Sequence, residues 1–158
     1  MTTDEIEDAL FEILQPLLPE GVKLIWSDPS APRPPKPYVM MDFLVYGRRV
    51  GKDELRQSSS GWDRKGLREF VLSVNAYGQD AHEILDELLT GMSLESTVAA
   101  LSEANFSSVN ESEIRDLTLL IEQRYETRAQ IDLTFYRTVT KPEELDWFDK
   151  VEVNDQLV

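Results

Sequence analysis

The feature that most constrains the fold is a change of hydrophobic period within residues 66–89. In the first half, apolar side chains occupy alternate positions, as in a half-buried strand: Phe70, Leu72, Val74 and Ala76. After Tyr77-Gly78 the period becomes helical, with Ile84, Leu85, Leu88 and Leu89 on one face. Asp80 is placed to cap the first turn of this helix. A strand that leads directly into an amphipathic helix predicts that the helix packs back on its own sheet.

The N-terminal part predicts a helix, a short strand, a proline-rich crossing and a second strand. Thr2 and Glu5 form a capping box that begins the helix, and the segment 16–21, with two prolines and a glycine, ends it. Alternation at 22–26 predicts a strand. Five of the eight prolines lie within 27–37, which predicts a stiff surface connection. Residues 38–47 are apolar on both sides, which predicts a central strand covered on both faces.

Residues 47–68 predict a long hairpin arm. Strands are expected at 50–57 and 67–76, joined by a polar tip at 58–66. Segment 48–68 holds seven Lys or Arg against Asp53, Glu54 and Asp63, a local charge of 7 − 3 = +4 in a chain of net charge −14. Trp62 at the expected tip has two interpretations: an interface anchor, because Trp is enriched at hot spots, or a side chain folded back on its own sheet.

The C-terminal part is more ambiguous. After a helix expected at 80–91, Ser93 is placed to cap a second short helix, and 105–110 predicts a turn. Segment 111–121 fits either a helix or a strand. A long strand is expected from Arg124 past Phe135, stopped by Lys141-Pro142. In the acidic tail, about 141–158, a helical turn is expected at 143–148, and 151–153 predicts an edge strand or a tail that pairs with a neighbour.

Together these patterns predict one α+β domain over residues 1–158, with a mainly antiparallel sheet, two or three packed helices and a long β-hairpin arm. A chain of 158 residues suits a single core. No apolar run approaches the ~20 residues of a membrane helix, so we expect no contact with a membrane. The N-terminal run MTTDEIEDAL carries early acids and no positive charge, so a signal peptide is not expected.

The residues do not predict an enzyme. The chain has no cysteine, and His82 is its single histidine; with Asp86 it supplies two ligands, whereas zinc or iron sites need three or more. No Ser-His-Asp order or glycine-rich phosphate loop is present. With 30 carboxylates, some pairs arise by chance and do not define an acid–base dyad. We therefore expect no catalytic residues, no cofactor and no metal.

The charge is unevenly distributed. Residues 1–20 and residues 79–104 each hold six acids and no Lys or Arg. One interpretation is ordinary solvated faces. The other is a charge-complementary contact, in which the basic arm of one copy meets an acidic surface of another.

Several short motifs occur in a fixed order. A proline-rich entry at 31–38 is followed by Arg68-Glu69, then seven residues, then Tyr77-Gly78-Gln79-Asp80-Ala81, and later by Arg115-Asp116-Leu117 and Arg128-Ala129. In this order the motifs resemble the neck-terminator, or tail-terminator, proteins of tailed phages, over roughly residues 22–139. The resemblance implies a ring-forming, tail-terminator-like fold.

The resemblance also implies a role. It implies a structural virion protein that forms a homohexameric ring, caps the tail tube and provides the joining surface for the head connector. The implied partners are the tail tube protein on one side and a neck or head-connector protein on the other, with the sheath as a further candidate. The implied location is the virion neck, after assembly in the host bacterial cytoplasm. Genome DNA would pass through the lumen without specific binding.

The charge pattern suits such a ring, because an acidic lumen repels phosphate and does not retain the genome. We expect much of the acidic surface to face the channel. The expected subunit or partner interface comprises Arg33, Arg48, Arg49, Arg56, Trp62, Arg64, Lys65 and Arg128. Reversing the charge at Arg48, Arg49 and Arg56 together is expected to weaken assembly.

Two alternatives remain open on the sequence. One is a neck stopper or head-completion protein. The other, from a different class, is an acidic DNA-mimic inhibitor, which would use the charge of −14 in place of phosphates. The basic arm and the proline-rich strip argue against the mimic, which needs neither.

Overall fold

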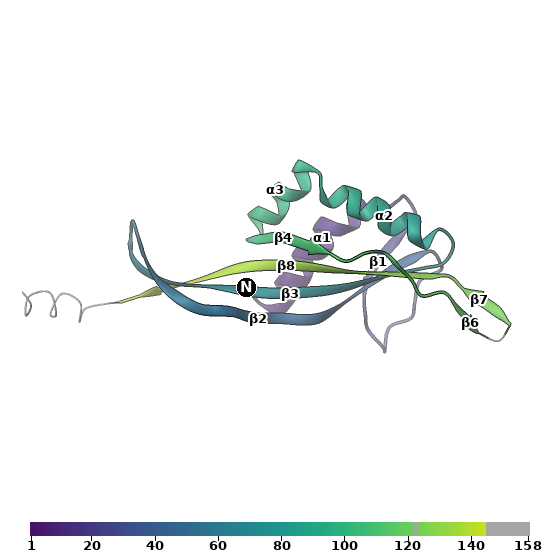
Figure 1. Cartoon of the computed structure of the whole chain (residues 1–158), viewed down its shortest axis with the longest axis horizontal. Coiled ribbons are helices and arrows are strands. Elements are labelled where there is room, and N and C mark those ends of the chain that lie inside the picture. Colours follow the sequence, from purple (N-terminus) through teal and green to yellow (C-terminus); the bar gives the residue numbers. More distant parts are fainter. Residues whose placement is uncertain (122, 145–158) are drawn as a thin grey trace, which may run out of the picture.

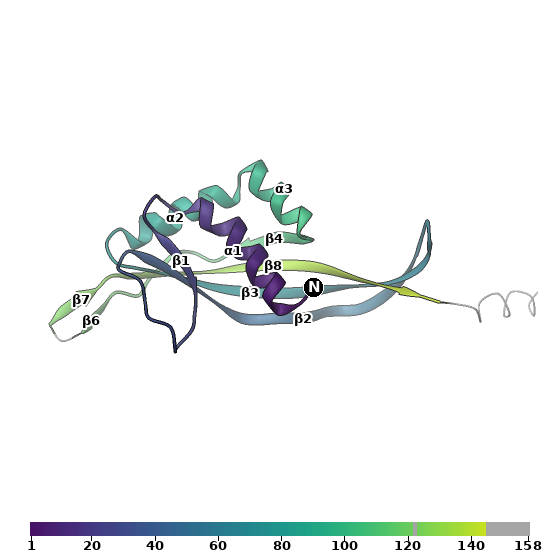
Figure 2. The same cartoon turned by 180° about the vertical axis from the view of Figure 1, so that it is seen from behind.

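A computed structural model describes residues 1–121 and 123–144, and a layer of helices covers one face of a long sheet (Figures 1 and 2). The described elements are α1 (Thr3–Leu14), the 3-10 turn η1 (Gln15–Leu17), β1 (Lys23–Trp26), β2 (Tyr38–Ser58), β3 (Gly61–Tyr77), α2 (Ala81–Met92), α3 (Glu95–Glu103), β4 (Phe106–Glu111), β5 (Arg115–Asp116), β6 (Leu119–Ile121), β7 (Arg124–Glu126) and β8 (Arg128–Glu143). This arrangement confirms the predicted α+β class with a long hairpin.

The sheet has the order β1-β2-β3-β8-β4, with β5 also paired to β8. Strand β1 runs parallel to β2, and the other pairs are antiparallel. Strands β6 and β7 form a separate two-stranded sheet. The β2–β3 hairpin and the β6–β7 hairpin project from opposite ends of the molecule (Figure 1).

The core lies between the sheet and the helices, as the change of period at residues 66–89 predicts. The alternating side chains of β3 and the apolar face of α2 belong to one buried cluster. Leu72 and Val74 from the sheet and Leu85 from α2 are fully buried. Removing this much apolar surface from water supplies the main driving force for the fold.

The helix starts are partly as predicted. The capping box is confirmed: the Thr2 amide donates to Glu5 Oε2 at 2.6 Å, and the Glu5 amide donates to Thr2 Oγ1 at 3.3 Å. The predicted side-chain cap at Asp80 is wrong. Asp80 has a left-handed backbone, φ 63°, rather than the extended backbone of a capping residue, and no side-chain cap forms.

The predicted Ser93 cap is also wrong. Leu94 is the residue that precedes α3, and it makes no side-chain cap. The Ser93 hydroxyl instead donates to the Thr90 carbonyl at 2.7 Å. Ser93 therefore satisfies the end of α2 rather than the start of α3.

Strand β2 is continuous where two strands were expected, and the predicted loop at 58–66 is wrong. Strand pairing runs through Ser58–Gly61, so only Ser59 and Ser60 form the turn. Irregular pairing bends β2 at three places without ending it. Trp62 consequently lies within β3, half-buried, opposite Gln57 in β2 and Glu143 in β8.

Coverage of 38–47 on both faces is also wrong. The helices lie on one face of the sheet, and the side chain of Leu44 is 60% exposed. Not every apolar residue of this segment is therefore buried.

The C-terminal half is richer in strands than predicted. The expected turn at 105–110 is largely strand β4, and 111–121 contains the short strands β5 and β6 rather than a helix. Thr127 separates β7 from β8, so the strand expected from Arg124 is interrupted. Tyr125, on β7, is 76% exposed.

Pro142 does not end β8, which continues to Glu143 and pairs Pro142 with Asp63. Strand β4 pairs with β8 only up to Arg137, so Pro142 has a strand partner on one side in the described sheet. A proline is tolerated at such an edge position because no second neighbouring strand requires an N–H from it. Glu143, expected in a helical turn, is in the strand; the remainder of that turn from residue 145 and the expected strand at 151–153 lie outside the described residues.

Candidate interaction surfaces

The base of the arm is tied to β8 through Glu69. Arg48 forms an ion pair with Glu69, whose side chain is mostly buried, and the Tyr136 hydroxyl donates to Glu69 Oε2 at 3.0 Å. This hydrogen bond to a carboxylate is the main reason that the pKa of Tyr136 is raised. The three side chains fix β2, β3 and β8 to one another where the arm leaves the body.

A second cluster lies beyond this base. Arg68 donates to both oxygens of Asp53, at 2.9 and 3.0 Å, and Arg49 donates to Asp53 at 2.9 Å. The hydrogen bond from Arg68 is the largest cause of the lowered pKa of Asp53, about 2. A Cβ at Gly66 would collide with the Asp53 carboxylate, so the cluster depends on that glycine.

The outer arm carries more exposed charges. Arg56 pairs with Glu54 at 2.6 Å, and Arg64 pairs with Glu143 at 2.6 Å. Exposed pairs of this kind contribute little to stability. Within residues 1–121 and 123–144, exposed Lys52 and Lys65 have no ion-pair partner. They line a shallow hollow of about 380 Å³ on the arm.

At the opposite end of the sheet, Tyr77 is enclosed by aromatic and cationic groups. Tyr38 stacks on it with ring centroids 5.0 Å apart, and the guanidinium carbons of Arg33 and Arg128 lie 5.7 and 5.1 Å from the ring centroid. Arg128 Nη2 also donates to Asn75 Oδ1 at 2.8 Å. Tyr38 and Tyr77 are buried, although no helix covers this face.

Gly78 allows this end to close. Its φ is +107°, and a Cβ there would lie 3.0 Å from Lys36 Cβ and 3.1 Å from Pro37 Cα. The Gly78 amide donates to the Thr127 carbonyl at 2.9 Å, beside Arg128. The proline-rich entry, Tyr77-Gly78 and Arg128-Ala129 therefore meet in space. We call this region the brace: residues 33, 36–38, 77–78 and 128.

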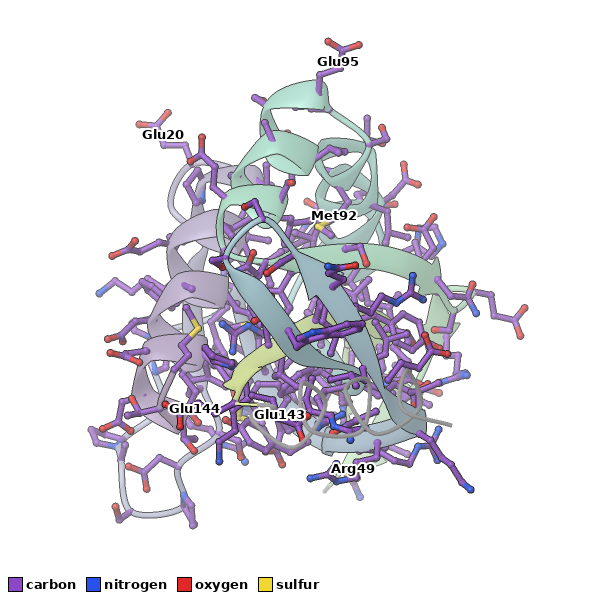
Figure 3. All side chains as sticks on the ribbon, turned by 90° about the vertical axis from the view of Figure 1, so that its left-hand side faces the viewer. Glu20, Arg49, Met92, Glu95, Glu143 and Glu144 are labelled. Atoms are coloured by element: carbon purple, nitrogen blue, oxygen red, sulfur yellow. The ribbon has the colours of Figure 1, made fainter. Side chains whose placement is uncertain are left out.

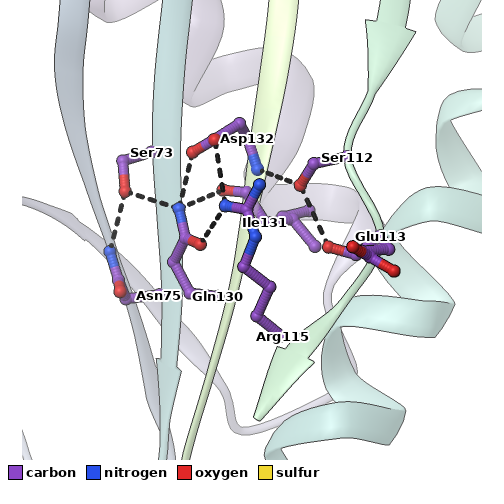
Figure 4. Close-up of polar contacts among 8 residues, drawn as sticks. All are labelled: Ser73, Asn75, Ser112, Glu113, Arg115, Gln130, Ile131 and Asp132. Atoms are coloured by element: carbon purple, nitrogen blue, oxygen red, sulfur yellow. Dashed lines mark hydrogen bonds and ion pairs between the residues drawn. The ribbon is translucent and has the colours of Figure 1, made fainter. Parts of the chain in front are cut away.

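A polar network continues from the brace along the uncovered face (Figure 4). Gln130 Nε2 donates to Ser73 Oγ at 3.1 Å and to Asp132 Oδ1 at 2.6 Å, while Arg115 donates to Gln130 Oε1 at 2.9 Å. Ser112 Oγ accepts the Asp132 amide at 2.8 Å. The network joins β3, β8, β5 and the segment before β5, and its buried polar groups are hydrogen-bonded.

The helical face carries the opposite charge to the arm. A groove of about 540 Å³ separates α1 from α3, with Glu12 and Glu103 among its lining residues and both exposed. Seen from the arm end, labelled Glu20 and Glu95 project outward from the helical side (Figure 3). Sequence reasoning identified the acidic segments but missed the groove, because its walls come from residues about 90 positions apart.

The eight predicted interface residues fall into two groups. Arg48, Arg49, Arg56, Trp62, Arg64 and Lys65 lie on the arm. Arg33 and Arg128 lie together at the brace, on Tyr77. The residues that the sequence analysis treated as one interface therefore lie on two separate surfaces.

The described residues contain no cluster of three or more His, Cys, Asp or Glu side chains suited to a metal. No helix in the part of the chain that the structure describes is long and apolar enough to cross a membrane. The notable features are extended, charged surfaces. Charged surfaces of this kind are suited to contacts with other macromolecules.

A model of the phage neck terminator protein family matches residues 4–157. The chain belongs to this family of structural proteins of the phage neck, which makes it a virion component. The comparison with curated proteins found no match. The resemblance of the short motifs is thus confirmed over nearly the whole chain.

Proposed function

We propose that this chain forms the ring that terminates the tail tube and presents the surface to which the head connector joins. The observation that carries the proposal is the family match over residues 4–157. The proposed ring is a homohexamer. Its proposed partners are the tail tube protein and a neck or head-connector protein. Assembly takes place in the host bacterial cytoplasm.

The charge distribution supports a ring through which DNA passes. Lys and Arg are concentrated on the arm. The helical segments 1–20 and 79–104 contain neither residue. We propose that the acidic surface left free between subunits faces the channel. It repels the phosphates, so the genome moves without salt-sensitive adhesion.

The two hairpins support contacts at both ends of the subunit. The arm and the β6–β7 hairpin project in opposite directions (Figure 1). Tyr125 on β7 is 76% exposed and Leu119 on β6 is 54% exposed. Exposed aromatic and aliphatic side chains on a projecting hairpin are suited to a protein interface.

The test is native mass together with negative-stain images of the purified chain, alone and with purified tail tubes. Rings, and density that closes one end of each tube, are expected. A chain that binds the isolated portal complex and leaves tube ends open would contradict the proposal and favour a stopper. Displacement of DNA from a DNA-binding enzyme, with no ring, would favour the mimic.

A further inference from the structure

The arm and the α1–α3 groove are distinct surfaces of opposite charge. A ring is built from heterologous contacts, in which a patch on one copy meets a different patch on the next copy. The arm extends beyond the helices of its own chain (Figures 1 and 2). It is therefore available to a neighbouring copy.

The arm offers an apolar pair beside two lysines, Lys52 and Lys65, that have no ion-pair partner within residues 1–121 and 123–144. Val50 and Leu67 are cross-strand partners, 38% and 37% exposed. They line the same hollow as Lys52 and Lys65. The arginines of the arm already pair with acids of their own chain, so these two lysines are the cations best placed for an external partner.

The groove offers the reverse arrangement. Its lining includes the apolar side chains of Ala9, Ile13 and Leu17 from the α1–η1 side, and those of Ala100 in α3 and Ala104 at its end. Glu12 and Glu103 add a negative charge on each side. Segments 1–20 and 79–104, which form these walls, contain no Lys or Arg to neutralise them.

We propose that the arm of one copy docks in the α1–α3 groove of the next copy. Lys52 and Lys65 face Glu12 and Glu103, and Val50 and Leu67 cover the apolar floor. Apolar burial supplies affinity, and the charges set the register and exclude other docking modes. The inference rests on the proposed ring and assigns its subunit contact.

A competing occupant of the arm is the acidic C-terminal segment. Residues 145–158 carry Asp146, Asp149, Glu152 and Asp155 against Lys150. The segment is net negative, as the groove is. It is therefore complementary to the basic arm and not to the groove. A chain that ends at residue 144 separates the two possibilities.

The experiment uses two charge-reversed variants, Lys52→Glu/Lys65→Glu and Glu12→Lys/Glu103→Lys. All four side chains are exposed, so both variants are expected to retain the fold. Like charges now face each other in each pure variant, and assembly followed by native mass should weaken about 100-fold. Lys23→Glu on β1, which changes the net charge by the same amount per site, is the control and should assemble normally.

Mixing the two variants gives the decisive result. In an alternating ring, every reversed arm meets a reversed groove and every native arm meets a native groove. Assembly should therefore return, with equal numbers of the two chains in each ring. Pure variants that assemble as the wild type does, or a mixture that stays monomeric, would overturn the inference.

Two further outcomes are informative. If ending the chain at residue 144 abolishes rings while Glu12→Lys/Glu103→Lys has no effect, the acidic segment is the occupant and the inference is wrong. If the mixture forms alternating rings that do not close tail tubes, the contact is correct and the proposed function fails. The two ideas therefore fail separately.

Discussion

The two ends of the long sheet are held together by different physical means. At the brace, buried tyrosine rings, two guanidinium groups and close backbone packing against Gly78 fix the chain. At the arm, ion pairs join the strands, and most of the arginines in these pairs have exposed side chains. The pairs around Asp53 and Glu69 are the best connected. The brace therefore depends on shape, and the arm depends on charge.

This difference has functional consequences for a neck protein. Packing is insensitive to salt and pH, whereas exposed charges are screened by salt and respond to pH. The strength of a contact made by the arm therefore depends on salt and pH. The packing at the brace does not. The comparison predicts that substitutions at the brace cause the largest losses of stability.

Gly78→Ala is expected to have the largest effect. The new Cβ meets Lys36 and Pro37 at 3.0–3.1 Å, at a φ of +107°. Backbone strain and overpacking together should lower the free energy of unfolding by about 2–4 kcal/mol, measured by urea denaturation. The control is Gly51→Ala on the arm, where φ is +69° and nothing lies within 4 Å of the new Cβ.

Gly51→Ala should cost about 1 kcal/mol, from the left-handed backbone alone. Equal losses for the two variants would show that the brace is not closely packed in solution. The comparison of the two ends would then rest on charge alone.

The brace also shows how far sequence reasoning reaches. The strand-to-helix change after Tyr77 was predicted because periodicity is local, and the core positions Phe70, Leu72 and Val74 follow from it. The proximity of Pro37, Tyr77 and Arg128 was not predictable from any one segment, since it depends on the register of β2, β3 and β8. The order of the motifs indicated a family, but it did not show that the motifs meet in space.

The errors at the arm have a different cause. Segment 58–66 is rich in serine, glycine and charge, which is typical of a loop, yet cross-strand pairing carries both strands almost to the turn. Pairing of β8 with β3 likewise continues through Pro142, where the sequence predicted that the strand stops. For the candidate interface, the positions of the cations could be read from the sequence, but their ion pairs could not. Lys52 and Lys65, which have no ion-pair partner among the described residues, therefore looked the same as the paired arginines.

An intermediate effect is expected for Tyr136→Phe. The substitution removes the hydroxyl that donates to Glu69 at 3.0 Å, at the base of the arm. Glu69 keeps Arg48 as a partner, so the loss should be about 1 kcal/mol in the free energy of unfolding. Tyr125→Phe, at a side chain 76% exposed on β7, is the matched control and should change nothing. A loss of equal size in both variants would mean that the Glu69 bond is not the cause.

The smallest effect is expected at Asp53, and it should depend on pH. Its pKa is lowered in the folded chain, from the usual value of 3.8 to about 2, chiefly by the hydrogen bond from Arg68. A lowered pKa means that the ionised carboxylate stabilises the fold above about pH 4, and that this contribution is lost as the pH falls through about 2. Asp53→Asn lacks the charge at every pH.

Wild type and Asp53→Asn should therefore differ at pH 7 and converge toward pH 2. Hydrogen exchange of the arm amides is the suitable measurement, because Asp53 lies on the arm and opening of the arm does not require unfolding of the core. Added salt should reduce the difference at pH 7 and leave the brace amides unchanged. A difference that persists at pH 2 would show that Asp53 acts through packing, and the arm would then resemble the brace.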